Sequence, residues 1–147
     1  MITRVMMPLE RITVSQSGLV PDKLNKLIKL NRDELEVLPE IILRTLKGNN
    51  QCTELEGRHR IYLFYLHGFQ EIPSYVLTDE RDQINANIAP NYTGQQILEA
   101  NALINHNWRW AERSARRKNQ TVLEHYGDAP ETSIELIKKE LKERGYP

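Results

Sequence analysis

Residues 54–77, ELEGRHRIYLFYLHGFQEIPSYVL, join a cluster of charged residues directly to a long apolar stretch. The alternating start predicts a strand that ends near Glu56, and Gly57 predicts a tight turn after it. The apolar stretch predicts a helix that begins at about Arg58 and stops at Gly68, because glycine readily adopts the conformation that ends a helix. EIPSYVLTD predicts one more short strand. The segment therefore requires a fold in which strands flank a buried helix.

The rest of the first 80 residues supplies partners for these elements. Residues 9–21, LERITVSQSGLVP, alternate loosely and predict a strand followed by a loop. Pro21 can open a helix, and residues 21–31 show mostly helical spacing. Apolar residues predict a strand from about Ile41, KGNN predicts a turn, and residues 51–57 predict the second strand of a hairpin. We expect an α+β unit over residues 1–80, a small mixed sheet of three or four strands with two helices.

A polar segment separates this unit from a helical second half. Residues 79–94 are polar and contain Pro90, which predicts a linker that we place at 81–93. From Gly94 onward the spacing is helical, and residues 130–145 predict a last amphipathic helix. One stripe of the long helix is apolar and consists of Ile97, Ile104, Trp108, Ala111 and Ala115. We expect a domain at 1–80, the linker, and a helical C-terminal extension at 94–147.

Composition narrows the class of protein. The formal net charge is zero, so the overall field does not indicate a nucleic-acid-binding protein, although a local patch still could bind. No apolar run approaches the roughly 18 residues of a membrane span, and the N-terminus lacks a signal-peptide core. Cys52 is the single cysteine and the histidines lack zinc spacing. His67 is expected to be a favourable cation at its helix end. These features predict a cytoplasmic protein without a membrane partner.

The first turn of the helix at Arg58 carries arginines where negative charge is normally preferred. Unpaired N–H groups and the helix dipole give this end a partial positive charge, which suits a bound anion. Arg58 and Arg60 break this local rule, and such breaks are typical of functional sites. A polyanion held by the amides and the arginines would resolve the conflict. Glu56 at the mouth would suit a magnesium ion or proton transfer, and it is the candidate catalytic residue.

A purely structural role explains the same residues equally well. Gly57 can serve the turn alone, and His59 can be a buried core histidine. The two arginines can pair with Glu54 and Glu56 in a surface network. The residues by themselves leave both interpretations open.

The segment also resembles the core motif of the ParB/sulfiredoxin-like superfamily, a G-x-x-R turn that follows a strand and opens a helix. The motif is often written D-G-x-H-R. Gly57 and Arg60 occupy the G-x-x-R positions, His59 occupies the histidine, and Glu56 stands where many members carry aspartate. LPEIILRTL (38–46) resembles the proline-led strand of the family, and KGNNQCTELEG resembles its hairpin. The resemblance covers residues 8–79, about half of the chain.

This resemblance implies a nucleotide-phosphate site made by Gly57, Arg58, His59 and Arg60. Members of the superfamily bind CTP or ATP, usually with magnesium. They include chromosome and plasmid partition proteins, a free-serine kinase and sulfiredoxin, and some have been described as nucleases. For this chain the resemblance implies a nucleotide-dependent switch or slow NTPase, with Glu56 assisting Mg²⁺, in DNA partition or related DNA transactions.

The chain departs from the family pattern in several places. Sulfiredoxin carries its catalytic cysteine just before the histidine, where this chain has Arg58, and Cys52 lies on the preceding strand, which argues against sulfinic acid reduction. The kinases need an upstream glutamate, for which Glu10 and Glu40 are candidates. The partition proteins carry two arginines in this turn, at other positions, and further domains for which we expect no room here. A small-molecule kinase of the free-serine type remains an alternative.

A second basic cluster lies in RWAERSARRK (109–118). On a helix its arginines form a stripe beside Trp110, which faces away from the apolar stripe; they are Arg109, Arg113, Arg116 and Arg117. The stripe predicts DNA phosphate binding with an aromatic for base stacking, or else only a solvated helix face. Residues 119–146 faintly resemble a helix-turn-helix, but early acidic residues favour a helical cap. A non-enzymatic DNA-binding or scaffold protein and a homodimer stay open alternatives.

Overall fold

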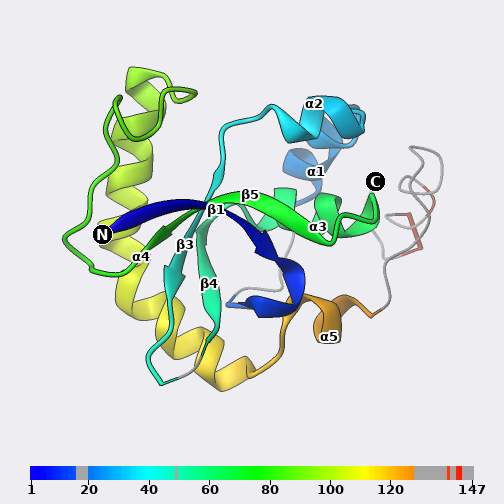
Figure 1. Ribbon diagram of the computed structural model, residues 1–147. Helices are drawn as coiled ribbons and strands as arrows, with labels where there is room; N and C mark the ends of the chain where they lie inside the picture. The colour runs from blue at the N-terminus through cyan, green and yellow to red at the C-terminus, as the bar shows by residue number, and fades with distance from the viewer. Residues whose placement is uncertain (16–19, 49, 128–138, 140–141, 144–147) are drawn as a thin grey trace.

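The computed structural model describes residues 1–15, 20–48, 50–127, 139, 142 and 143. Its strands are β1 (Ile2–Pro8), β2 (Ile12–Thr13), β3 (Ile41–Thr45), β4 (Cys52–Glu56) and β5 (Glu71–Leu77), and they form a five-stranded sheet in the order β1-β5-β3-β4-β2 (Figure 1). The pairs β1–β5 and β3–β4 are antiparallel, whereas β3–β5 and β2–β4 are parallel. The sheet is therefore mixed, and its combination with flanking helices confirms the α+β class.

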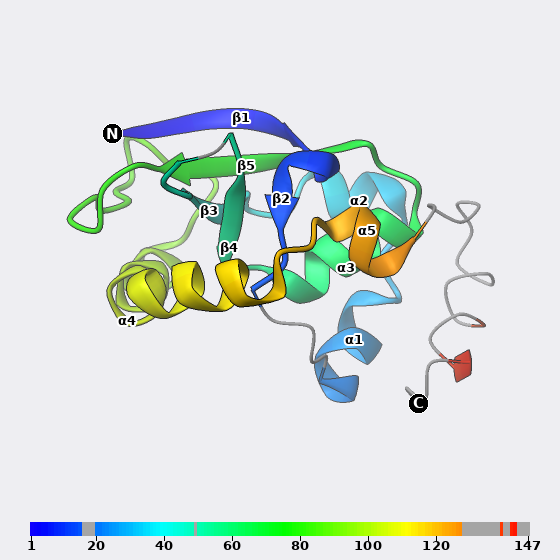
Figure 2. The ribbon, with the colours of Figure 1, turned by 90° about the horizontal axis from the view of Figure 1, so that it is seen from below.

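The N-terminal residues form an edge strand that the sequence did not predict. β1 pairs with β5 from Ile2 opposite Leu77 to Pro8 opposite Glu71, and Figure 2 shows it along the outside of the sheet. The strand predicted from residue 9 is wrong except at its short β2 portion, because Leu9–Arg11 forms a 3₁₀ helix, η1. Pro8 lacks an N–H to donate into a sheet, so the chain leaves the edge there.

The helix predicted over residues 21–31 ends early, and a second helix that was not predicted follows it. α1 covers Pro21–Leu27 and α2 covers Arg32–Glu36. The side chain of Asn31 accepts a hydrogen bond from the Glu34 N–H at 2.8 Å, and the Glu34 carboxylate accepts one from the Asn31 N–H at 3.1 Å. This reciprocal cap starts a new helix. Among the residues that the structure describes, three α-helices therefore precede β5, not the predicted two.

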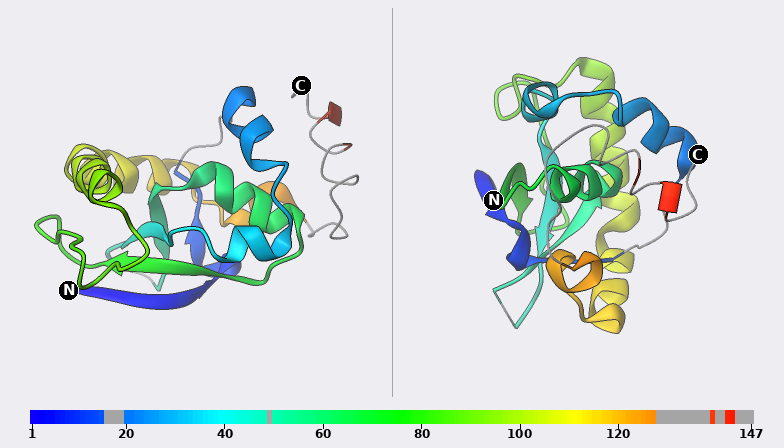
Figure 3. Two further views of the ribbon diagram at one scale, coloured as in Figure 1. Left: turned by 90° about the horizontal axis from the view of Figure 1, so that it is seen from above. Right: turned by 90° about the vertical axis from the view of Figure 1, so that its right-hand side faces the viewer.

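Helix α3 (Arg58–Leu66) fills one core of the molecule, as predicted, and Gly68 follows with a φ of +80°. Its fully buried side chains Tyr62, Leu63 and Leu66 share a core with residues of α1, α2 and the sheet. Figure 3 shows α3 next to α1. Full burial of one large apolar side chain contributes about 1.5–3 kcal/mol. The helix is therefore firmly anchored, and its first turn is held in place.

Helix α4 (Gly94–Lys118) covers the opposite face of the sheet, to the left of β3 and β4 in Figure 1. The predicted apolar stripe is confirmed, since Ile104, Trp108, Ala111 and Ala115 are buried and Ile97 is partly buried. The stripe meets Ile42, Leu55, Tyr75 and Leu77. Neighbours of these residues on β3 and β5, namely Ile41, Leu43 and Val76, belong to the first core. Alternation along β3 thus supplies both cores.

The polar segment before α4 is packed against the sheet. Ile84 and Ala89 lie in the second core, and the side chain of Asn101 makes hydrogen bonds of 2.8 and 2.9 Å to the backbone of Ile84. The Tyr92 hydroxyl donates to the Glu40 carbonyl. Helix α4 and the segment before it therefore cover one face of the sheet that the first 80 residues form. The division at 81–93 stays a prediction.

After α4 the structure describes one short helix, α5 (Val122–Tyr126). The helix predicted at 130–145 lies outside the described residues except at 139, 142 and 143, and so does most of the helix-turn-helix candidate. Among the described residues, no helix is both long enough and apolar enough to cross a membrane.

Candidate functional site

Gly57 forms the turn between β4 and α3, and a larger residue does not fit there. Its φ is +111°, in the region that strongly favours glycine. A Cβ on this residue would lie 2.7 Å from Cγ2 and 3.0 Å from Cβ of Ile41. Ile41 is fully buried at the start of β3 and has little room to move. The predicted strand–glycine–helix turn is confirmed.

The first turn of α3 has no side-chain cap. Its first hydrogen bond runs from the Ile61 N–H to the Gly57 carbonyl at 2.9 Å. The N–H groups of Arg58, His59 and Arg60 therefore have no acceptor within the helix. This end of α3 keeps the donors and the partial positive charge that an anion site uses.

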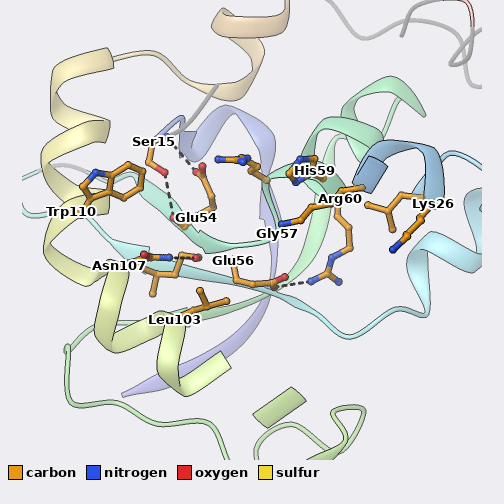
Figure 4. A pocket seen from close by; sticks show the side chains of 14 residues that line it. Ser15, Lys26, Glu54, Glu56, Gly57, His59, Arg60, Leu103, Asn107 and Trp110 are labelled. Carbon is orange, nitrogen blue, oxygen red and sulfur yellow. Dashed lines mark hydrogen bonds and ion pairs between the residues drawn. The ribbon is translucent and has the colours of Figure 1, made fainter. Parts of the chain in front are cut away.

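A cavity of about 480 Å³ opens at this turn, between α1, α3 and α4 (Figure 4). This volume lies within the roughly 300–1,000 Å³ typical of small-molecule sites. All the predicted site residues of the turn line it, namely Glu56, Gly57, Arg58, His59 and Arg60. The structure therefore brings them together around one space. The arginine stripe of α4 does not line this cavity.

Arg58 differs from Arg60 in having no ion pair or hydrogen bond to the described residues. Its Nε–H is buried and makes no hydrogen bond within the described residues. Two exposed lysines of α1, Lys23 and Lys26, line the same cavity. Leaving a buried donor unpaired costs about 1–3 kcal/mol, and more for a charged group. An anion in the cavity would supply the missing acceptor.

His59 links α3 to the start of α1. Its Nε2 accepts a hydrogen bond of 2.8 Å from the Val20 N–H, so the neutral ring carries its proton on Nδ1. Burial, together with the nearby cations Arg58 and Lys23, lowers the pKa of His59 to about 4. The ring is therefore neutral near pH 7. His59 holds the cavity wall together, and the cations around it already create a positive field.

Arg60 is engaged on the other side of the turn. One Nη donates to Glu56 Oε2 at 2.9 Å, and the other donates to the Pro39 carbonyl. The side chain of Arg60 is only 13% exposed. The pairing with Glu56 was one of the structural alternatives, and it is observed for Arg60. Arg60 thus fixes the position of Glu56 and joins the turn to the segment before β3.

Glu54 is a second carboxylate in the cavity wall, and it is buried. Its Oε2 accepts a hydrogen bond of 3.4 Å from the Ser15 N–H and lies 3.4 Å from the Thr53 hydroxyl, whose proton is directed to the Thr13 carbonyl at 2.8 Å. The Ser15 hydroxyl donates to the Glu54 carbonyl at 3.5 Å. These contacts attach the end of β2 to β4. The sequence predicted Glu54 only as an ion-pair partner, and it did not place Ser15 here.

The far wall of the cavity comes from α4, which the sequence assigned to a separate part. Leu103, Asn107 and Trp110 line it. The Asn107 side-chain NH₂ donates to the Leu55 carbonyl at 3.1 Å, which fixes the amide against β4. Trp110 is 38% exposed, away from the apolar stripe as expected. The spacing of residues 103, 107 and 110 places them on one side of the helix, and this spacing is the sequence pattern that could have identified them as a common surface.

A metal ion would find few ligands here without the phosphates. Within the part of the chain that the structure describes, no three histidine, cysteine or acidic side chains gather as a metal-binding group. Glu56 offers one carboxylate, with Oε2 already bonded to Arg60. Magnesium is commonly held by one or two carboxylates, water and substrate phosphates. Glu56 therefore fits the ion only as a single ligand beside a bound nucleotide.

The predicted arginine stripe divides into two kinds of side chain. Arg109 pairs with Glu80 at 3.5 Å, and Arg116 pairs with Glu112 at 3.1 Å and donates to the Lys47 carbonyl at 2.7 Å. Arg113 and Arg117 are exposed and form no ion pair within the described residues. The stripe is thus partly neutralised, and DNA binding by it stays a prediction.

The remaining candidates lie away from the cavity. Cys52 is in the first core, where burial raises the pKa of its thiol. Glu40 is buried and accepts hydrogen bonds from Asn91 at 3.2 Å and Arg4 at 3.3 Å. Glu10 lines a different hollow, beside α5. Neither upstream glutamate lines the cavity.

The expectation that His67 is a cation is wrong. The side chain is buried, and burial together with Arg32 lowers its pKa, which favours the neutral ring. Its carbonyl accepts a 2.5 Å hydrogen bond from Arg32. The arginine therefore supplies the positive charge at the end of α3.

No family model matches this chain, and no curated protein is significantly similar to it. Membership in the ParB/sulfiredoxin-like superfamily therefore stays a prediction from the motif.

Proposed function

We propose that the cavity at the start of α3 binds the phosphates of a nucleotide, CTP or ATP. The observation that carries this proposal is the uncapped first turn of α3 beside Arg58, whose buried Nε–H has no partner among the described residues. Different phosphate oxygens would accept from that donor and from the amides of the first turn. Exposed Lys23 and Lys26 would attract the anion to the cavity.

The residues of the turn then have different tasks. Arg58 and the amides of the first turn contact phosphate, and Gly57 allows the backbone to reach it. Arg60 is a positioning residue, because its guanidinium is taken up by Glu56 and the Pro39 carbonyl. His59 secures α1 through Val20, which keeps the lysines of α1 beside the cavity. When bound with the nucleotide, Mg²⁺ neutralises phosphate charge, and Glu56 would hold it.

The wider assignment is a nucleotide-dependent switch or slow NTPase of the ParB/sulfiredoxin-like type. The chain order within the motif supports it, since β3 and β4 form the hairpin, Gly57 the turn, and α3 leads to β5. β5 then returns parallel to β3. A role in DNA partition, a homodimer and a cytoplasmic location stay predictions.

The observations favour this function over the two alternatives. A kinase of the free-serine type needs an upstream glutamate near the phosphates, and neither Glu10 nor Glu40 lines the cavity. A DNA-binding scaffold would rest on the α4 stripe, where Arg109 and Arg116 already have acidic partners. The α3 turn offers both a cavity and unsatisfied donors.

Calorimetric titration with CTP, ATP and GTP in the presence of Mg²⁺ tests the proposal. We expect at least one nucleotide to bind more tightly than about 1 mM. Arg58→Ala should weaken that binding about 10- to 100-fold, since a hydrogen bond to a charged group contributes about 1.5–3 kcal/mol. Arg113→Ala removes the same charge from an exposed site and should leave the affinity unchanged. Equal binding by all three proteins would refute the proposal.

Product analysis separates the switch from the kinase. The same nucleotides are incubated with the protein and a panel of amino acids, and phosphorylated products are sought by mass spectrometry. We expect none, with at most slow release of inorganic phosphate. A phosphorylated amino acid would replace the switch by a phosphotransferase acting at the same site.

A further inference from the structure

The cavity has two chemically different sides. Arg58, Lys23 and Lys26 place positive charge on the side of α1 and α3. The α4 side is uncharged and consists of Leu103, Asn107 and Trp110. Figure 4 shows Lys26 and Trp110 on opposite sides of the Gly57 turn. A ligand that fills the cavity would therefore meet cations at one end and an aromatic surface at the other.

Trp110 is the feature of this wall that a phosphate site does not explain. The two tryptophans of the chain lie on α4 two positions apart, but their surroundings differ. Trp108 is buried in the second core, with the Arg44 guanidinium 4.1 Å from its ring centroid. Trp110 is 38% exposed and borders the cavity. An indole with an available face next to an anion site is the arrangement that stacks on a nucleobase.

We propose that Leu103, Asn107 and Trp110 form a base-binding subsite, so that the ligand is a complete nucleoside polyphosphate. This inference rests on the proposed function, because the phosphates must lie at the α3 turn for the base to reach α4. The Trp110 indole stacks on the base and Leu103 supplies apolar contact beside it. The ligand then bridges α3 and α4, which makes α4 part of the site.

Asn107 adds a polar contact to the same wall. Its side-chain NH₂ donates to the Leu55 carbonyl, which orients the amide and leaves Oδ1 as an acceptor. Asn107 and Trp110 both lie on the α4 side of the cavity in Figure 4. A base edge that carries an N–H donor can pair with it. The subsite thus combines a stacking surface with one fixed acceptor.

The test compares nucleoside triphosphates with inorganic triphosphate, all with Mg²⁺, on the full chain. We expect the nucleotides to bind about 5- to 100-fold more tightly than triphosphate, because stacking of one base on an aromatic side chain increases the affinity by about this factor. Trp110→Ala should remove this difference and leave triphosphate binding unchanged. Trp110→Phe should keep most of it. Leu98→Ala, an exposed change on the same helix outside the cavity, is the matched control.

Fluorescence provides an independent readout. Nucleotide, but not triphosphate, should quench the wild-type tryptophan emission, and Trp110→Phe should lose the quenching while it keeps the affinity. If triphosphate and the nucleotides bind with equal affinity, the base-binding subsite is refuted and the proposed phosphate site is retained. Failure of both triphosphate and nucleotides to bind overturns the two together. Trp110→Ala with undiminished nucleotide preference overturns the subsite alone.

Discussion

The α3 turn and the α4 stripe are both arginine clusters in the sequence, but the structure gives them different surroundings. At the α3 turn, Arg58 has a buried Nε–H with no partner among the described residues, beside uncapped amides and a cavity. On α4, Arg109 and Arg116 are exposed and ion-paired. Exposed ion pairs contribute about 0–1 kcal/mol and leave few unsatisfied donors. The α3 turn is therefore the better candidate for an anion site, because it combines donors that lack a partner among the described residues with a concave space.

The largest expected effect breaks the α3 turn itself. Gly57→Ala should lower the free energy of unfolding by about 2–5 kcal/mol, because it combines backbone strain with a clash against Ile41. Gly48→Ala is the matched control, since Gly48 also has a positive φ of +84° but nothing within 4 Å of an added Cβ. It should cost only about 1–2 kcal/mol. Urea denaturation measures both, and equal losses would show that the turn is not tightly packed.

Acid should weaken the same region through His59. The pKa is about 4 in the folded protein and the ordinary value is 6.5, so the unfolded chain binds the proton more readily. The stabilisation is complete above pH 6.5, is lost between pH 6.5 and 4, and does not change further below pH 4. The loss is on the order of 3 kcal/mol, and His67, with its lowered pKa, adds to it.

His59→Gln checks the assignment, because a glutamine oxygen can still accept from Val20 and does not titrate. Urea unfolding at a series of pH values should then show a shallower fall below pH 6.5 for this variant than for the wild type. His106→Gln, at an exposed position of α4, should keep the wild-type slope. An unchanged slope in His59→Gln would contradict the burial of a neutral His59.

The energies of two ion pairs, one at the α3 turn and one on α4, can be compared directly. A double-mutant cycle with Glu56→Gln and Arg60→Met should give a coupling of about 1 kcal/mol, because Arg60 is 13% exposed. The cycle with Glu112→Gln and Arg116→Met on α4 should give less than about 0.5 kcal/mol, because Arg116 is 52% exposed. Both are measured by urea unfolding. A stronger pair on α4 would reverse the ranking of the two clusters.

Substitution of the α1 lysines tests which charges outside α3 belong to the nucleotide site. Lys26→Ala should weaken nucleotide binding about two- to fivefold, as expected for an exposed charge at the mouth. Lys29→Ala removes a nearby exposed charge that does not line the cavity, and calorimetry should show no change. Equal losses in the two variants would mean that only the general field of α1 matters.

The smallest expected effect belongs to the α4 stripe. Arg113→Ala combined with Arg117→Ala should change nucleotide affinity less than about twofold, since neither residue lines the cavity. Duplex DNA binding, measured by fluorescence anisotropy at several salt concentrations, should be weak and equal in both proteins. A steep salt dependence that the double variant flattens would instead identify the stripe as a DNA interface.

Local patterns predicted the elements that local forces determine. The β3–β4 hairpin, the Gly57 turn, α3 and the apolar stripe of α4 follow from turn residues and periodicity, and all are present. β1 was missed because an exposed edge strand lacks a buried alternating face. Helix α2 was not predicted, although its start was readable in principle, since NRDE at 31–34 is a capping box.

The site was predictable only in its contiguous part. Glu56 to Arg60 are neighbours in sequence, so their clustering was visible. Arg58 and Arg60 could not be told apart, because the Pro39 carbonyl that engages Arg60 comes from a distant segment. Lys26 and Trp110 come from α1 and α4, and only the packing of these helices around α3 brings them to the same cavity.

The most direct test of the central claim is an amide-resolved NMR titration of the ¹⁵N-labelled protein with CTP or ATP and Mg²⁺. The account predicts that the backbone amides of Arg58, His59 and Arg60 shift most and saturate together, while those of Arg113 and Arg117 stay in place. Shifts concentrated on the α4 arginines, with the α3 turn unchanged at saturating nucleotide, would contradict it.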